Sequence, residues 1–165
     1  MIATALRSSL PSLRTAVRAA PRVAPVRMMP VRSFQTSRMV SGVQTMYTAE
    51  HEWIRYDDET NIGQIGITNH AQESLGDVVY IELPQIELEV TKGDQIGSVE
   101  SVKAASDIYT PVNGIIVGAN TQLGDEPGLI NKSPMEKGWL AEIKLTNPGD
   151  LDDLLTEEAY LATLD

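Results

Sequence analysis

Cysteine is absent from this chain of 165 residues. The protein therefore has no disulfide bond, no thiolate nucleophile, no cysteine-ligated zinc and no iron–sulfur cluster. Histidine is nearly absent too, because only His51 and His70 occur, nineteen residues apart. That spacing is not the one by which two histidines of a helix bind a metal. The sequence thus predicts no metal site.

Acidic residues are missing from the first 45 positions, which contain seven arginines. The rest of the chain has six basic residues and all 23 acids, so a segment of charge +7 precedes one of −17. A strongly acidic domain repels phosphate backbones and suits partners with basic docking surfaces. No apolar run approaches the roughly eighteen residues that a membrane span needs. We therefore expect no binding to nucleic acid and no membrane segment.

Residues 1–41 have the composition of a mitochondrial transit peptide, rich in Arg, Ser, Ala and Pro and free of acids. A disordered basic tail is the alternative, and arginines interrupt every apolar run that a secretory signal would need. Arg32, Phe34 and Ser37 lie ten, eight and five residues before Gly42, which resembles the two-step matrix processing pattern. We expect a transit peptide over 1–41, with an approximate cleavage site, a domain over 42–165 and a location in the mitochondrial matrix.

The domain is long enough for one compact unit and consists mainly of short β-like runs separated by Gly, Pro, Asn and Asp. One helix is expected over 69–75, with Asn69 as N-cap and Gly76 just beyond its end. After Pro148 the apolar spacing becomes helical, and Thr156 is expected to cap a last helix. The expected strands lie at 53–56, 62–67, 77–83, 87–90, 95–99, 105–109, 114–118 and 139–145.

Lys103 lies among small residues between two of these runs, in the order Glu100-Ser101-Val102-Lys103-Ala104. Small neighbours leave a lysine accessible to a modifying enzyme, and flanking strands would hold the turn rigid. Composition by itself favours an ordinary solvated lysine, since most lysines have no other role.

The sequence of residues 100–104, together with residues 76–84 upstream and 111–114 downstream, resembles that of the H-protein family of the glycine cleavage system. Members of this family are lipoate carriers. The likeness extends over nearly the whole of 42–165. Two positions depart from the family pattern, because His70 and Met135 stand where tyrosine is usual, which affects the expected cleft contacts. The matching residues are 47–53, 66–68, 76–84, 100–104, 111–114, Asn131, Pro134, 138–139 and 147–148.

The resemblance implies a mainly β, lipoyl/biotinyl-carrier-like flattened β-barrel sandwich (a barrel-sandwich hybrid) with a short internal helix and C-terminal helices. It implies lipoate in amide linkage to Lys103, with Glu100, Ser101, Val102 and Ala104 as the context that lipoylating enzymes recognise. The cofactor would supply the chemistry and the protein its placement and protection.

The same resemblance implies a carrier and not an enzyme, and we expect the chain to be a monomer. It would take an aminomethyl group from glycine decarboxylase, the P-protein, to the folate-dependent aminomethyltransferase, the T-protein. Dihydrolipoamide dehydrogenase, the L-protein, would then reoxidise the arm. A role in lipoate relay to other complexes is also compatible. Residues 47–53 and 69–75 are expected to shelter the loaded arm.

Several other interpretations remain open. A lipoyl domain of a 2-oxo-acid dehydrogenase complex would more often contain Asp-Lys-Ala at the modified lysine, and a biotin carrier would have methionines on both sides of it. An unmodified mitochondrial scaffold needs no accessible lysine. A catalytic acid–lysine pair of Glu100 and Lys103, or an acid-oriented His51, is less favoured than a solvated Glu100 and a structural His51. Hydrolase and nucleotide-binding fingerprints are missing.

Overall fold

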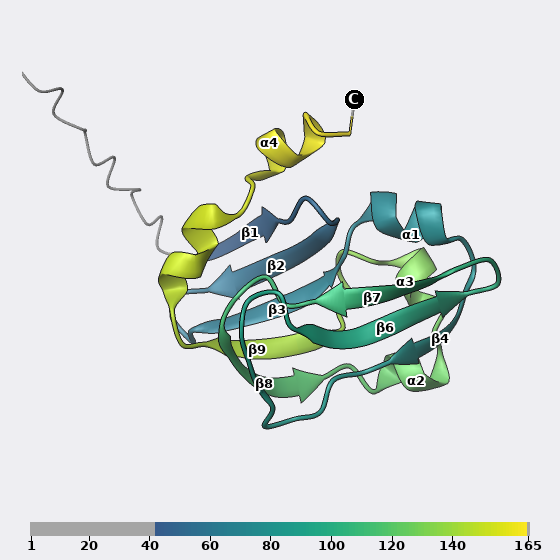
Figure 1. The fold of residues 1–165 in the computed structure, drawn as a ribbon, viewed down its shortest axis with the longest axis horizontal. Coiled ribbons are helices and arrows are strands. Elements are labelled where there is room, and N and C mark those ends of the chain that lie inside the picture. The colour runs from purple at the N-terminus through teal and green to yellow at the C-terminus, as the bar shows by residue number, and fades with distance from the viewer. Residues whose placement is uncertain (1–41, 165) are drawn as a thin grey trace, which may run out of the picture. The chain divides into compact units, whose positions relative to one another are not determined.

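The computed structural model describes residues 42–164, which form two antiparallel β-sheets with four short helices (Figure 1). The larger sheet has the strand order β1-β2-β3-β9-β8-β5 and the smaller the order β4-β6-β7. The prediction of a mainly β fold with a short internal helix is confirmed. The strands are β1 (Val43–Tyr47), β2 (Glu52–Asp57), β3 (Ile62–Ile67), β4 (Val78–Glu82), β5 (Glu89–Val90), β6 (Gln95–Ser101), β7 (Ala105–Tyr109), β8 (Gly114–Ala119) and β9 (Ala141–Leu145).

Successive side chains of each strand point to opposite faces of its sheet, and the buried faces of the two sheets form one core. In β8, Ile116 is buried while its neighbours Ile115 and Val117 are exposed. Ile116 belongs to the same cluster as Val99 of β6 and Ile143 of β9. Strand β1 was not among the predicted strands. Its sequence shows no clear apolar alternation, because most of its side chains are half-buried and not alternately buried and exposed. Pairing with β2 defines this strand.

The strands expected at 53–56 and 62–67 are confirmed as β2 and β3, which pair as an antiparallel hairpin. Trp53 is fully buried, and its indole N–H donates to the carbonyl oxygens of Ile67 at 2.9 Å and Pro134 at 3.2 Å. A Cβ at Gly66 would lie only 2.6 Å from the indole ring. The absence of a side chain at Gly66 of β3 therefore leaves the space that the indole of Trp53 in β2 occupies.

Helix α1 (Asn69–Leu75) has the predicted bounds, but Asn69 is not its cap. The N-cap is Thr68, whose backbone is extended and whose hydroxyl accepts from the amide of Ala71. Asn69 is instead the first helical residue. Threonine and asparagine both cap helices well, so residue type by itself does not decide between them. Helices α2 (Gln122–Asp125) and α3 (Leu129–Lys132) follow β8.

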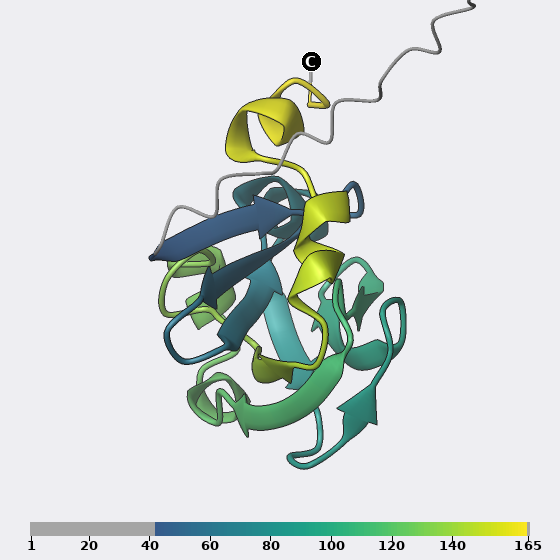
Figure 2. The same cartoon turned by 90° about the vertical axis from the view of Figure 1, so that its left-hand side faces the viewer.

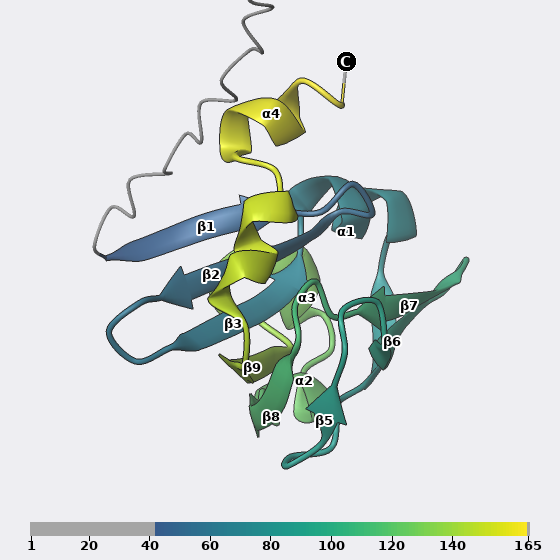
Figure 3. The same ribbon diagram turned by 60° about the vertical axis from the view of Figure 1, so that its left-hand side comes forward.

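The C-terminal segment is helical in two pieces. A 3₁₀ helix, η1 (Pro148–Asp153), is followed by extended residues and then by α4 (Glu157–Leu161). Thr156 caps α4 as predicted, its hydroxyl accepting from the amide of Ala159. Leu155 interrupts the helical run because it pairs with Tyr47 of β1. Figures 2 and 3 show the segment running from β9 past β3 and β2 to α4, beside β1.

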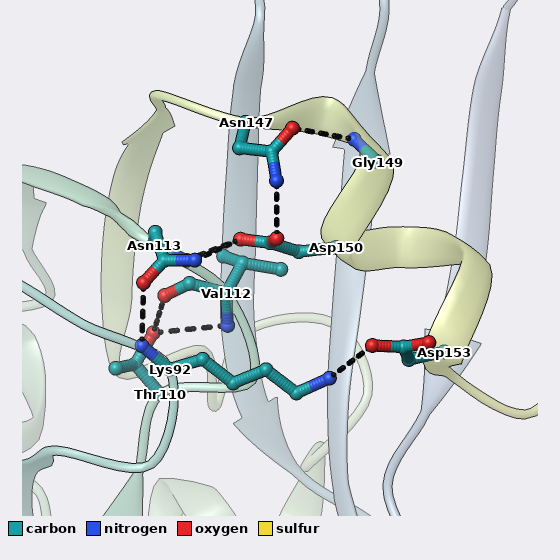
Figure 4. Close-up of polar contacts among 8 residues, drawn as sticks. All are labelled: Lys92, Thr110, Val112, Asn113, Asn147, Gly149, Asp150 and Asp153. Atoms are coloured by element: carbon teal, nitrogen blue, oxygen red, sulfur yellow. Dashed lines mark hydrogen bonds and ion pairs between the residues drawn. The ribbon is translucent and has the colours of Figure 1, made fainter.

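Asp150 of η1 ties this segment to the β7–β8 loop (Figure 4). Its buried carboxylate accepts from the backbone and side-chain amides of Asn113 at 2.8 and 2.6 Å, and from Asn147 at 2.6 Å. Three donors compensate the cost of burying the charge. Lys92 and Asp153 form an exposed ion pair at 3.0 Å beside this cluster.

The predicted transit peptide over 1–41 lies outside the described residues, and its cleavage stays a prediction. Within residues 42–164, every helix is too short or too polar to cross a membrane.

Candidate functional site

Lys103 lies in the tight turn that joins β6 to β7. The amide of Ser101 donates to the carbonyl oxygen of Ala104 at 2.7 Å, and the Ser101 hydroxyl accepts from the amide of Ala104 at 3.0 Å. The Lys103 amide approaches the same hydroxyl at 3.3 Å. One serine side chain thus holds the turn, as such residues do in short loops. The Lys103 side chain is exposed.

The four neighbours named as recognition context surround this turn. Glu100 is an exposed strand residue opposite Tyr80 of β4 and Ala105 of β7. Val102 is 72% exposed and Ala104 is exposed. No interaction in the described structure joins Glu100 to Lys103, which favours the solvated interpretation of the glutamate.

The turn packs on the junction between α1 and β4, at the side of the molecule where the β6–β7 hairpin projects (Figure 1). The Val102 amide donates to the carbonyl oxygen of Asp77 at 3.1 Å. Gly76 has φ 80° and ψ −152°, a conformation essentially restricted to glycine. A Cβ at Gly76 would lie 3.1 Å from Cε of Lys103. Gly76 therefore provides both the turn and the space over which the lysine stem lies.

Asn131 of α3 holds the junction between α1 and β4 through three hydrogen bonds. Its side-chain oxygen accepts from the amide of Val78 at 2.9 Å, and its nitrogen donates to the carbonyl oxygen of Gly76 at 2.9 Å and to the side chain of Gln72 at 3.1 Å. One half-buried amide thus satisfies backbone groups on both sides of Asp77. Asn131 was quoted for the resemblance, but only the structure shows what it does.

We expect Asn131→Ala to lower the free energy of unfolding by about 1–3 kcal/mol, because it leaves the backbone groups of Gly76 and Val78 without partners. Modification of Lys103 by a lipoylating enzyme should slow as its support loosens. Chemical denaturation and a lipoylation time course measure the two effects. Lys132→Ala, an exposed neighbour on the same helix, is the control, and equal behaviour of the two variants would contradict the assigned role.

A cavity of about 270 Å³ lies beside the β6–β7 hairpin. One wall is residues 50–52, a second is α1, and the floor is the first part of β7, which starts two residues after Lys103. The cavity is lined by Glu50, His51, Glu52, Ile67, Ala71, Ser74, Leu75, Ala105, Ser106, Asp107 and Ile108. We call it the hairpin cavity. The segments expected to shelter an arm, 47–53 and 69–75, are the ones that provide its two walls.

Three acidic residues, Glu50, Glu52 and Asp107, are among those that line the hairpin cavity. Glu52 is buried and paired reciprocally with Thr48, whose hydroxyl donates to the carboxylate and accepts from the Glu52 amide at 3.0 Å. A larger hollow of about 480 Å³ shares Glu50 and Glu52 and continues to Tyr109 of β7. A cationic group would be stabilised between these carboxylates.

His51 does not form an acid-oriented catalytic pair with Glu52. Its Nδ1 lies 2.9 Å from the hydroxyl of Tyr160, and its ring lies 4.4 Å from that of His70. The structural interpretation of His51 is therefore the one that the contacts support. His70 and Met135, the two departures from the family pattern, line one small cavity of about 180 Å³ beside α4.

Comparison with known proteins addresses the family directly. A family model described as Glycine cleavage H-protein matches residues 45–165. The chain belongs to this family.

Curated relatives agree with the assignment. A glycine cleavage system H protein of Thermotoga maritima is 52% identical over 114 residues, which cover 69% of this chain and 90% of the relative. One from Marinomonas is 52% identical over 118 residues, covering 72% and 92%. The resemblance stated from the sequence is thus confirmed.

A solved structure extends the agreement to the fold. The crystal structure of a glycine cleavage system H protein from Mycobacterium marinum superposes with a TM-score of 0.67 at 36% identity, covering 73% of this chain and 96% of that chain. The predicted lipoyl-carrier-like barrel sandwich is confirmed.

Proposed function

We propose that Lys103 carries lipoate in amide linkage to its ε-amine and that the loaded hairpin moves between enzymes of glycine cleavage. Family membership makes the chain the shuttle subunit of that system. Lipoate supplies a dithiolane that accepts an aminomethyl group and electrons. The chain supplies the tether, the exposed turn and a cavity beside it.

The position of Lys103 carries the proposal. Its side chain is exposed at a turn held by Ser101, and it lies over Gly76, where no side chain obstructs it. A lysine stem is long and flexible, so a rigid turn at its base confines the arm without preventing its reach. The residues present therefore fit a lysine-linked acyl group, and small neighbours allow a modifying enzyme to approach.

The hairpin cavity gives the arm a place to rest. Residues of β7 rise about 3.3 Å each along the strand, so Asp107 lies within the span of a lysine extended by an eight-carbon acyl chain. An aminomethyl group is an amine and is cationic when protonated. The carboxylates of Glu50, Glu52 and Asp107 would attract it electrostatically while the apolar side chains of Ile67 and Leu75 exclude water.

The partners that we propose are the P-protein, the T-protein and the L-protein, together with the enzymes that attach lipoate. The chain itself would catalyse no turnover. The acidic character of residues 46–165 suits brief, sequential docking to basic entrances, and salt would weaken each encounter. Tethering raises the effective concentration of the arm at each partner.

Peptide mass spectrometry tests the modification. The chain purified from its own mitochondria, or incubated with a lipoylating enzyme and its lipoyl donor, should yield a lipoylated peptide at Lys103. An unmodified Lys103 in both preparations would overturn the proposal and leave the chain as an unmodified scaffold of the same fold.

We also propose the mitochondrial matrix as its location, supported by the acid-free, arginine-rich composition of residues 1–41. In an import assay with isolated mitochondria, the full chain should become protease-protected and shorter by about that segment. Replacing Arg7, Arg14 and Arg18 by Gln should reduce import severalfold, because it removes three of the seven positive charges of the segment. Unchanged import would contradict the proposal that residues 1–41 target the chain to mitochondria. Lys144→Gln, which removes a positive charge outside these residues, is the control.

A further inference from the structure

The hydroxyl of Tyr160 in α4 lies between two segments that are far apart in the sequence. It is 2.9 Å from Nδ1 of His51 and 2.9 Å from the hydroxyl of Thr68. The Tyr160 ring is buried and stacks on Tyr47 of β1, with ring centroids 4.8 Å apart. One phenol therefore joins the C-terminal helix to the β1–β2 loop and to the start of α1.

The end of the β1–β2 loop and the first residue of β2 form the first wall of the hairpin cavity, where His51 lies between Glu50 and Glu52. His51 has φ 74°, a left-handed backbone that is uncommon outside glycine, and that asparagine, aspartate and histidine adopt more often than other residues do. Its carbonyl oxygen accepts from the amide of Thr68 at 2.9 Å. The hydrogen bond to Tyr160 and the contact with the His70 ring hold the side chain of His51 in place. Glu50 and Glu52 flank this residue in the cavity wall.

Helix α1 forms the second wall, and Thr68 is its N-cap. The Thr68 hydroxyl accepts from the amide of Ala71 at 3.3 Å while it contacts Tyr160. Ala71, Ser74 and Leu75 of this helix line the cavity. Both walls are thus fixed to the same oxygen atom, although α4 itself provides no residue to the cavity lining.

We propose that Tyr160 is a positioning residue, which holds the two walls of the hairpin cavity at the separation that a lysine-linked arm requires. The proposal rests on the proposed function, since the arm is the occupant of that cavity. The stack on Tyr47 and the contacts with Trp53 suffice to bury the aromatic ring. The hydroxyl has a separate role, because it satisfies His51 and Thr68 where a phenylalanine would leave both without this partner.

Tyr160→Phe removes the hydroxyl and keeps the stack. Tyr56→Phe is the matched control, since Tyr56 is also buried and its hydroxyl donates to Asn61 at 2.8 Å, at the distant end of the β2–β3 hairpin. Amide hydrogen exchange of the unmodified full chain is measured first. We expect residues 49–53 and 69–76 to exchange roughly 3- to 10-fold faster in Tyr160→Phe than in Tyr56→Phe, the factor that corresponds to one ordinary hydrogen bond.

The loaded chain provides the second measurement. Water releases the aminomethyl group as ammonia and formaldehyde and leaves the thiol, with both the carbon–nitrogen and the carbon–sulfur bonds broken. In the absence of the T-protein, mass spectrometry should show this loss roughly 3- to 10-fold faster in Tyr160→Phe than in Tyr56→Phe. The rate of lipoylation should be the same in both, because the exposed Lys103 turn is untouched.

A double-mutant cycle with His51→Asn, a residue that tolerates the left-handed backbone, tests the link itself. If His51 transmits the effect, Tyr160→Phe should change the loop exchange little once His51 is replaced. Equal exchange and equal release in the Tyr160 and Tyr56 variants would overturn the positioning role. If the wild-type chain is never lipoylated, the proposed function fails, whereas the exchange comparison still decides whether Tyr160 holds the two walls.

Discussion

Lys103→Arg should abolish lipoylation and reduce glycine cleavage in the reconstituted system by at least ~100-fold. A guanidinium keeps the charge and length of the side chain, but it offers no amine that can be acylated. The loss is large because a tethered arm acts at an effective concentration in the millimolar range. Free lipoate present at trace level does not reach that concentration. Glycine-dependent release of carbon dioxide and ammonia measures it.

The fold should survive this change. Lys103 is exposed and has no ion pair, since the ion pair within the described residues joins Lys92 to Asp153. Thermal unfolding of Lys103→Arg should therefore match that of the unmodified wild-type chain. Lys132→Arg, on the surface of α3, is the control and should retain full activity. Glycine cleavage at the wild-type rate by Lys103→Arg would refute the carrier role of this residue.

Trp53→Ala should lower the free energy of unfolding by about 3–5 kcal/mol, the range for removing a large aromatic side chain from a core. The indole is fully buried, fits against Gly66, and donates to two carbonyl oxygens that would lose their partner. The unfolding temperature should fall by roughly 10–20 °C for a domain of this size. Circular dichroism during thermal unfolding measures the change.

Trp53→Phe separates packing from hydrogen bonding. It keeps most of the apolar volume and should lose about 1–3 kcal/mol, since the carbonyl oxygens of Ile67 and Pro134 are left without their donor. Val43→Ala, at a side chain that is 63% exposed, should stay within about 0.5 kcal/mol of wild type. Equal losses for Trp53→Ala and Val43→Ala would show that the core does not depend on the indole.

Local sequence patterns predicted most strands correctly, where alternation of apolar residues and the positions of turn residues indicate the same bounds. They also identified the candidate lysine. The β2–β3 hairpin, α1 and the Thr156 cap follow from side chains within a few positions of one another. Strand β1 and the break at Leu155 do not, because each depends on pairing with a distant partner. The N-cap of α1 is Thr68 and not Asn69, and the Thr68 hydroxyl contacts both Ala71 and the distant Tyr160, a contact that no local pattern indicates.

The candidate site divides in the same way. Small residues around Lys103 indicated an accessible turn, and the family resemblance supplied its chemistry. Gly76 and Asn131 were visible as matching residues, yet their contacts with the turn connect three segments separated by up to 55 residues. Nothing in the sequence indicated a role for Tyr160. A tyrosine in a short C-terminal helix predicts only that one side of the helix packs against the domain.

The sequence by itself determined the family, the mainly β architecture, the division into a +7 segment and a −17 remainder, and the lysine that carries the hypothesis. These properties depend on composition and on neighbours along the chain. Only the tertiary structure decided which residues support that lysine and which build the cavity beside it. Hydrogen bonds and burial act between atoms close in space, and here the atoms that meet come from β1, α1, α3 and α4, which folding alone brings together.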